Sequence, residues 1–265
     1  MNPALKTNNR HSHRTWRKFL SPILLILTWE ITTRAGLVES WFLPGPFLVF
    51  KTLYGMTISG EVPYHTAISM GRAAAGYLAA AVLGIGLGLL IAWSILIEDF
   101  FDPLIELIRP LSSFALVPIL FLWFGVGDTS KIILIFKSCF FPILLNTIAG
   151  IKGVDKKLIM AAKSLGANEG QLWIRVLIPS ALPMIITGLR ISTAMAMMSL
   201  VGVEMLSSDS GLGFLVIDAQ RTFDTQRVFA GIIVLSVVGF TVDRVSRIIQ
   251  SKALYWHTQT SLGGQ

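Results

Sequence analysis

The segment Ala73–Ile97 reads AAAGYLAAAVLGIGLGLLIAWSILI and contains no charged side chain in 25 consecutive residues. A helix needs about 20 mostly apolar residues to cross the ~30 Å hydrocarbon core of a lipid bilayer. This segment is therefore long enough and apolar enough to span a membrane as one helix. Its length and hydropathy predict an all-α integral membrane protein.

The composition of the whole chain agrees with this prediction. Of the 265 residues, 53% are hydrophobic and 14% are charged, whereas a soluble domain carries about 25% charged residues. The charges are too few to cover a water-soluble globule, and the apolar content is too high for intrinsic disorder. A single cysteine, Cys139, excludes an intrachain disulfide and a cysteine-based metal cluster.

Five further segments approach the length of a membrane span. Together with the segment quoted above, the six expected spans are 16–33, 73–97, 104–124, 132–151, 184–205 and 228–249. The first of them follows basic residues, as a signal peptide would. It is followed by Thr33–Gly36 rather than by a small-x-small cleavage site. We therefore interpret it as an uncleaved span and expect about six transmembrane helices.

The distribution of Lys and Arg predicts the orientation of these spans. With the N-terminus inside, the cytoplasmic segments hold 14 Lys and Arg and the external segments hold 6, and cytoplasmic loops are the ones enriched in these residues. Both termini are therefore expected in the cytoplasm, with 1–18 as a basic tail and 19–265 as a single transmembrane domain. Basic segments against anionic lipid headgroups also explain the net charge of +7. The bilayer, and no nucleic acid, is the expected partner of these charges.

The longest loop on the predicted cytoplasmic side, 152–183, has an internal pattern. It reads KGVDKKLIMAAKSLGANEGQLWIRVLIPSALP. Asp155 is placed to cap a short helix that ends at Gly166 in a left-handed conformation. Asn168 and Gln171 have the spacing of a capping box, which begins a second helix.

Two prolines follow this helix–turn–helix pattern. Pro179 and Pro183 are expected to interrupt the helix before the chain re-enters the membrane. A rigid, partly apolar hairpin on the cytoplasmic face suits the docking of another protein. The alternative is a packed loop that only connects two spans.

Three elements of this loop stand at the spacing of a known motif. They are Ala161-Ala162, then Gly166, then Ile178-Pro179. The pattern resembles the cytoplasmic motif of ABC-importer permease subunits, which reads Glu-Ala-Ala, three residues, Gly, a longer spacer, an apolar residue and Leu-Pro. The chain differs from it in having Met160 in the acidic position and Ile178 in place of Leu.

The resemblance extends over nearly the whole chain. The other matching elements are Leu43–Pro46, Leu122–Gly125, Phe141–Ile143 with Asn146-Thr147, Leu182-Pro183 with Thr187–Arg190, and Glu204 with Gly211–Gly213. Together they are similar to the sulfonate, taurine and nitrate branch of the permease family, which takes up small anions and some thiamine-pyrimidine precursors. The resemblance implies a type I, MetI-like fold with a cytoplasmic coupling helix.

The resemblance also implies a mechanism and a set of partners. Family members work in the bacterial inner membrane as two permease subunits, two ATPase subunits and an external solute-binding protein. The residues that would dock on the ATPase are Ala161, Ala162, Leu165, Gly166, Ile178 and Pro179. The chain contains no GxxxxGK[ST] phosphate-binding loop, so ATP and Mg are expected on the partner, with no cofactor and no enzymatic activity in this chain. The alternative function is an ion-gradient-driven secondary transporter or a channel.

Two ionisable residues are candidates for the translocation path. Lys137 lies inside the span 132–151, where an ionisable side chain is costly and tends to face a cavity or a partner. It would hold a passing anion, or else extend to the outer surface or pair with Glu204. Glu204 lies at the outer end of the span 184–205, where the resemblance places a gating or subunit-interface region, and a structural role is the alternative.

The glycines of the quoted segment predict packing and not nucleotide binding. Gly84, Gly86 and Gly88 form a GxGxG string, but it lies inside a span and no strand precedes it. Gly84 and Gly88 are four residues apart and, with Ala80, form a face of small residues. Such a face lets two helices approach closely in lipid.

Overall fold

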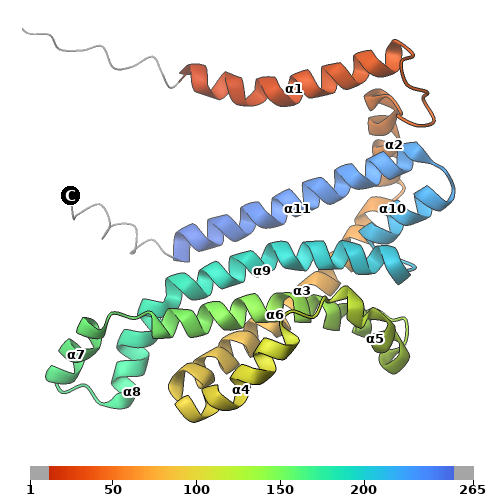
Figure 1. Cartoon of the computed structure of the whole chain (residues 1–265). Helices are drawn as coiled ribbons and strands as arrows, with labels where there is room; N and C mark the ends of the chain where they lie inside the picture. Colours follow the sequence, from red (N-terminus) through yellow and green to blue (C-terminus); the bar gives the residue numbers. More distant parts are fainter. Residues whose placement is uncertain (1–11, 254–265) are drawn as a thin grey trace, which may run out of the picture. The chain divides into compact units, whose positions relative to one another are not determined.

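The computed structural model describes residues 12–253, and every regular element within them is a helix (Figure 1). Residues 1–11 of the predicted basic tail lie outside the described part of the chain. The α-helices are α1 (Ser12–Arg34), α2 (Pro46–Ile58), α3 (Glu61–Trp93), α4 (Ile95–Ile108), α5 (Val117–Phe124), α6 (Asp128–Lys152), α7 (Lys156–Ser164), α8 (Glu169–Leu172), α9 (Ile178–Ser207), α10 (Leu212–Arg221) and α11 (Thr225–Ala253). They belong to two compact units, one of 12–61 with 216–232 and one of 62–215 with 233–253.

In the smaller unit, α1 and α2 are joined by a segment with two buried prolines, Pro44 and Pro46. Pro46 stands in the first turn of α2, where the missing N–H would have no partner in the helix. The indole N–H of Trp29 donates to the Pro44 carbonyl at 3.1 Å. This bond ties the end of the segment back to α1. The helix α2 has no counterpart among the predicted spans.

In the larger unit, α3 and α9 both pack closely against α6. A Cβ added at Gly88 of α3 would lie 2.8 Å from the Thr147 Cβ of α6, and one added at Gly188 of α9 would lie 2.7 Å from the Asn146 Cβ. Small residues thus let the helix backbones approach each other, as expected for helices in lipid. The buried core between these helices includes Ile135 and Leu200.

Four helices are long and apolar enough to cross a membrane by length and composition. They are Glu61–Trp93, Asp128–Lys152, Glu169–Ser207 and Thr225–Ala253. The third of these is the continuous helical run of α8, the π-helical turn Trp173–Leu177 and α9. In the same order, they contain the predicted spans 73–97, 132–151, 184–205 and 228–249. The first helix ends at Trp93, four residues before the end of its predicted span. The first predicted span, 16–33, lies within α1, which is not among the four. The prediction of an all-helical membrane protein is confirmed.

The predicted third span, 104–124, is not one helix. It is divided among α4, a 3-10 turn at Phe114–Leu116 and α5, and the segment 109–113 between them is not helical. Arg109 still has helical dihedral angles and donates its N–H to the Ile105 carbonyl, and the helix ends after it because Pro110 has no N–H to donate. The hydropathy of the segment was sufficient for a span, but its backbone is interrupted.

The prolines of the loop 152–183 do not interrupt the helix as predicted. Pro179 stands in the first turn of α9, and Pro183 lies inside this helix, which continues to Ser207. A π-helical turn at Trp173–Leu177 directly precedes α9. Proline is tolerated in a first turn because its missing N–H would be unpaired there. In membrane helices the groups freed by an internal proline are re-satisfied by local adjustments of this kind.

Candidate functional site: the cytoplasmic loop and the polar groups of the spans

The first half of the loop forms the short helix α7 with the predicted ends. The Asp155 carboxylate accepts a hydrogen bond from the Lys157 backbone N–H at 2.9 Å, which caps the start of the helix. Gly166 follows the helix with φ +81°, and its N–H donates to the Lys163 carbonyl at 3.0 Å. A left-handed glycine in this position is a common helix end. The predicted first helix of the loop is confirmed.

The second half of the loop begins with a complete capping box. The Gln171 N–H donates to Asn168 Oδ1 at 2.8 Å, and the Asn168 N–H donates to Gln171 Oε1 at 3.2 Å. Two N–H groups at the start of α8 are thus satisfied by one residue pair. The hairpin is held by local bonds and does not need a partner to form.

The apolar residues of α7 divide between two faces. Ile159 and Ala162 pack against a buried cluster that includes Leu172 and Leu177. Leu158 is 50% exposed and Leu165 is 89% exposed. One face of the hairpin therefore anchors it to α9 and the end of α6, and the other presents apolar side chains to the outside.

The six candidate docking residues are not equally accessible. Ala161, Leu165, Gly166 and Pro179 are exposed, whereas Ala162 and Ile178 are partly buried against the cluster that anchors the hairpin. A partner can contact the first group directly. Ala162 and Ile178 can affect docking only indirectly, by fixing the positions of α7 and α9.

Lys137 and Glu204, the two candidates for the translocation path, are not brought together. The Lys137 ammonium donates to the Leu111 carbonyl and lies 6.0 Å from the centre of the Phe141 ring. Glu204 pairs instead with Arg72, at 2.9 Å. The predicted alternative of a Lys137–Glu204 pair is wrong, because an arginine of α3 already neutralises the acid.

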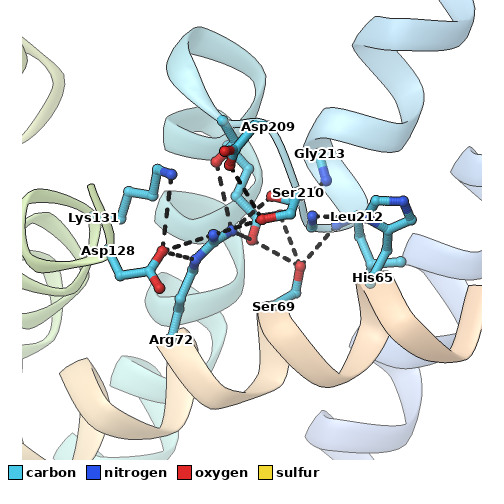
Figure 2. A network of polar contacts seen from close by, with 12 residues as sticks. His65, Ser69, Arg72, Asp128, Lys131, Asp209, Ser210, Leu212 and Gly213 are labelled. Carbon is cyan, nitrogen blue, oxygen red and sulfur yellow. Dashed lines mark hydrogen bonds and ion pairs between the residues drawn. The ribbon is translucent and has the colours of Figure 1, made fainter. Parts of the chain in front are cut away.

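Glu204 belongs to a buried polar cluster near the C-terminal end of α9, and Figure 2 labels its neighbours Ser69, Arg72 and Gly213. Its side chain is fully buried. The Ser69 hydroxyl lies 2.8 Å from both carboxylate oxygens, and the Gly213 backbone N–H donates to Oε2 at 2.9 Å. With Arg72, these donors satisfy a charge that would otherwise be costly to bury.

Arg72 connects this carboxylate to the start of α6. Its Nη2 and Nε lie 2.7 and 2.8 Å from Asp128 Oδ1, and its third nitrogen, Nη1, donates to the Ser210 carbonyl at 2.7 Å. The buried ammonium of Lys131 lies 4.0 Å from the same Asp128 oxygen. We call Ser69, Arg72, Asp128, Lys131, Glu204 and Gly213 the Arg72–Glu204 cluster. It joins four helices, α3, α6, α9 and α10, and contains two cations and two acids.

The sequence interpretation missed most of this cluster. It assigned Arg72 to an external loop, because the apolar run begins at Ala73. The structure begins α3 at Glu61, which places Ser69 and Arg72 three residues apart on one helix face. Pro63, in the first turn of α3, is a helix-start signal that could have extended the predicted helix.

Most of the chain matches a known family of membrane transport proteins. A family model described as "Binding-protein-dependent transport system inner membrane component" matches residues 67–255. The Bacillus subtilis (strain 168) protein provisionally named aliphatic sulfonates transport permease protein SsuC is 38% identical over 242 residues, which cover 91% of this chain and 88% of the relative. The taurine transport system permease protein TauC of Escherichia coli (strain K12) is 36% identical over 242 residues, which cover 89% of this chain and 87% of the relative.

The fold also matches a solved structure. A chain of the MetNI methionine ABC transporter, in an inward-facing conformation, aligns with a TM-score of 0.61 at 14% sequence identity. The alignment covers 70% of this chain and 93% of the solved chain. At this identity the match concerns the fold alone, and it agrees with the MetI-like architecture expected from the sequence.

Proposed function

Because this chain belongs to the family of inner-membrane components of binding-protein-dependent transport systems, we propose that it is the permease of an ABC importer for a small organic anion of the aliphatic sulfonate or taurine class. The sulfonate and taurine names of the relatives that are 38% and 36% identical support this choice of solute. A bicarbonate transport system permease, CmpB of Synechocystis sp., is 31% identical over 249 residues and widens the class to other small anions.

The observation that carries the proposal is the hairpin of α7 and α8. It is locally capped and anchored, and it still presents Leu165 with 89% of its surface exposed. An exposed apolar side chain on a rigid element suits a protein partner better than water. We assign this face to a cytoplasmic ATPase subunit that binds ATP and Mg and transmits its closure to α9 through the anchored side of the hairpin.

The assembly proposed has two ATPase subunits, a second permease copy and an external solute-binding protein. The permease lies in the bacterial inner membrane with both termini in the cytoplasm. The Lys and Arg distribution supports this orientation, since the hairpin segment 152–183 is among the most basic of the chain. The permease itself moves solute and catalyses no reaction.

The test is to purify the chain from its native membrane in mild detergent and identify the proteins that accompany it. We expect an ATPase with a phosphate-binding loop at one copy per permease. A co-purifying binding protein would then be screened with alkyl sulfonates, taurine, nitrate, bicarbonate and thiamine-pyrimidine precursors. A chain that purifies alone and moves solute down an ion gradient in vesicles would instead support a secondary transporter and would refute the proposal.

A further inference from the structure

A cavity of about 400 Å³ lies next to the interruption in the predicted third span. Its walls come from the non-helical segment 109–113 and the following Phe114, from α6 and from α9. Ser113, Lys137, Ser138 and Ser199 supply polar groups, and Met195 and Met198 supply flexible apolar surface. All of these residues belong to the larger of the two compact units.

The charge of this cavity is positive. Arg109 and Lys137 both line it, and none of the lining residues is acidic. A lysine ammonium has three N–H donors. In the described residues the hydrogen-bond acceptor found for Lys137 is the Leu111 carbonyl, with the Phe141 ring beside it. Donors thus remain for a ligand that carries negative charge.

Three serine residues line the same cavity as this lysine. Ser113 Oγ is 2.8 Å from Ser138 Oγ, and Ser138 Oγ is 3.1 Å from Ser199 Oγ. They come from the non-helical segment, from α6 and from α9. The Ser138 hydroxyl also donates to the Leu134 carbonyl at 3.0 Å, and rotation about the C–O bond lets a hydroxyl turn its proton towards another acceptor instead. The cavity therefore combines a positive charge with adaptable donors from three parts of the chain.

The position of Lys137 places the cavity inside the membrane. Lys137 is nine residues after Asp128, about 13 Å along a helix that is about 37 Å long. At this depth an irregular backbone is tolerated only where protein covers it or where it lines a water-filled cavity. In membrane transporters, interrupted helices often form the solute site, because their backbone and side-chain polar groups are free to bind the solute.

We infer that this cavity holds the oxyanion group of the transported solute during its passage, with Lys137 as the counter-charge and Ser113, Ser138 and Ser199 as hydrogen-bond donors. The class of ligand is a small sulfonate or a related oxyanion, which rests on the proposed function. The apolar side of the cavity, with Met195 and Met198, receives the short alkyl part. Glu204 takes no part in this site, since Arg72 and Ser69 already bind its carboxylate.

Uptake of radiolabelled ethanesulfonate and taurine into vesicles tests this inference. The vesicles contain the full complex of permease, ATPase and binding protein, with ATP inside. Lys137→Gln retains a donor for the Leu111 carbonyl but removes the charge, whereas Lys137→Arg retains the charge. We expect Lys137→Gln to lower the uptake rate by at least about tenfold, as for the loss of a charged hydrogen bond, and Lys137→Arg to preserve most of it. Ser113→Ala is expected to give a smaller decrease.

Two controls distinguish the loss of a solute site in Lys137→Gln from a loss of folding or of coupling to the ATPase. ATP hydrolysis stimulated by the binding protein is expected to persist in Lys137→Gln, which shows that the complex is folded and coupled. Lys51→Met, at an exposed lysine of α2, is the matched control and is expected to retain wild-type uptake. If Lys137→Gln transports both solutes at the wild-type rate, the lysine only holds the Leu111 carbonyl and the inference is wrong. If the wild-type complex transports neither solute, the proposed function fails instead.

Discussion

The carboxylate of Glu204 shows how much one buried residue depends on its neighbours. Gly211 has φ +113°, and a Cβ at this position would collide with the Glu204 carboxylate. A Cβ at Gly213 would lie 2.7 Å from the Glu204 Cβ. Glycine is therefore needed at both positions for the chain to pass close to the acid and for the Gly213 N–H to donate to it.

Replacement of Glu204 by alanine is expected to destabilise the permease strongly. Removal of one partner of a buried ion pair costs up to about 3–5 kcal/mol, and the buried Arg72 would keep only the exposed carboxylate of Asp128 as its counter-charge. The expected result is a clear loss of stability in a denaturant titration of the detergent-solubilised protein. Asp243→Ala, in the exposed Asp243–Arg247 pair of α11, is the control and should change stability by less than about 1 kcal/mol. Equal losses in the two variants would refute a special role of the buried pair.

At the scale of helices, the glycines of α3 have unequal roles. A Cβ at Gly88 would lie 2.8 Å from the Thr147 Cβ, whereas a Cβ at Gly86 would meet nothing within 4 Å. The predicted packing face of Gly84 and Gly88 is confirmed, since a Cβ at Gly84 would also lie 3.1 Å from Ile143 of α6.

Gly88→Ala and Gly86→Ala are a matched pair on one helix. We expect Gly88→Ala to cost about 1–3 kcal/mol, because α3 and α6 must move apart to admit the methyl group. Gly86→Ala should be neutral or stabilise by up to about 1 kcal/mol, since alanine is the better helix former. The midpoint of heat unfolding in detergent measures both, and a reversed order would show that α3 does not pack on α6 through Gly88.

The hairpin of α7 and α8 gives a second prediction at this scale. Gly166→Asp is expected to uncouple ATP hydrolysis from transport while the permease remains folded and inserted. Aspartate tolerates a left-handed backbone better than most residues, and a Cβ at Gly166 meets nothing within 4 Å. The new charge would, however, lie beside the exposed Leu165 of the proposed docking face.

Gly60→Asp is the control for this variant. Gly60 has φ +83° and an equally open Cβ position, but it lies between α2 and α3. ATP-driven uptake and ATP hydrolysis are measured together in vesicles. Normal uptake by Gly166→Asp, or equal uncoupling by both variants, would contradict the assignment of the hairpin to coupling.

At the scale of the whole chain, the orientation of α6 can be tested directly. Val126 precedes α6 and is 65% exposed, and Leu165 follows it in the hairpin. The native Cys139 is fully buried and should react little with a membrane-impermeant maleimide. We expect Leu165→Cys to be labelled only from the cytoplasmic side and Val126→Cys only from the other. Labelling of both from one side would show that α6 does not cross the membrane.

The sequence was most informative for features that depend on residues close together in the chain, such as helix caps and the mean hydropathy of a span. The caps at Asp155, at Asn168 with Gln171, and at Gly166 involve residues two or three positions apart. They were therefore visible in the order of residues alone. Four of the predicted spans coincide with helices that are long and apolar enough to cross a membrane. Their positions could be predicted because mean hydropathy is a property of neighbouring residues in the sequence and does not depend on tertiary contacts.

Hydropathy could not show where the backbone is interrupted. The segment 104–124 is apolar throughout most of its length, and Arg109-Pro110 and Pro118 are the signals of interruption in its sequence. Pro183, by contrast, lies inside α9 without ending it. Whether a proline ends a membrane helix depends on which nearby groups can satisfy the freed carbonyl, and those groups are placed by the rest of the fold.

The sequence by itself determined that the chain is a helical membrane protein, which family it resembles and how its cytoplasmic hairpin is capped. Only the tertiary structure decided that Glu204 pairs with Arg72, which is 132 positions away, and that Lys137 meets Ser113 and Ser199 around one cavity. The physical reason is the range of the interactions. Hydropathy and capping act within a few residues along the chain, whereas a buried charge is satisfied by whichever groups helix packing brings within about 3 Å.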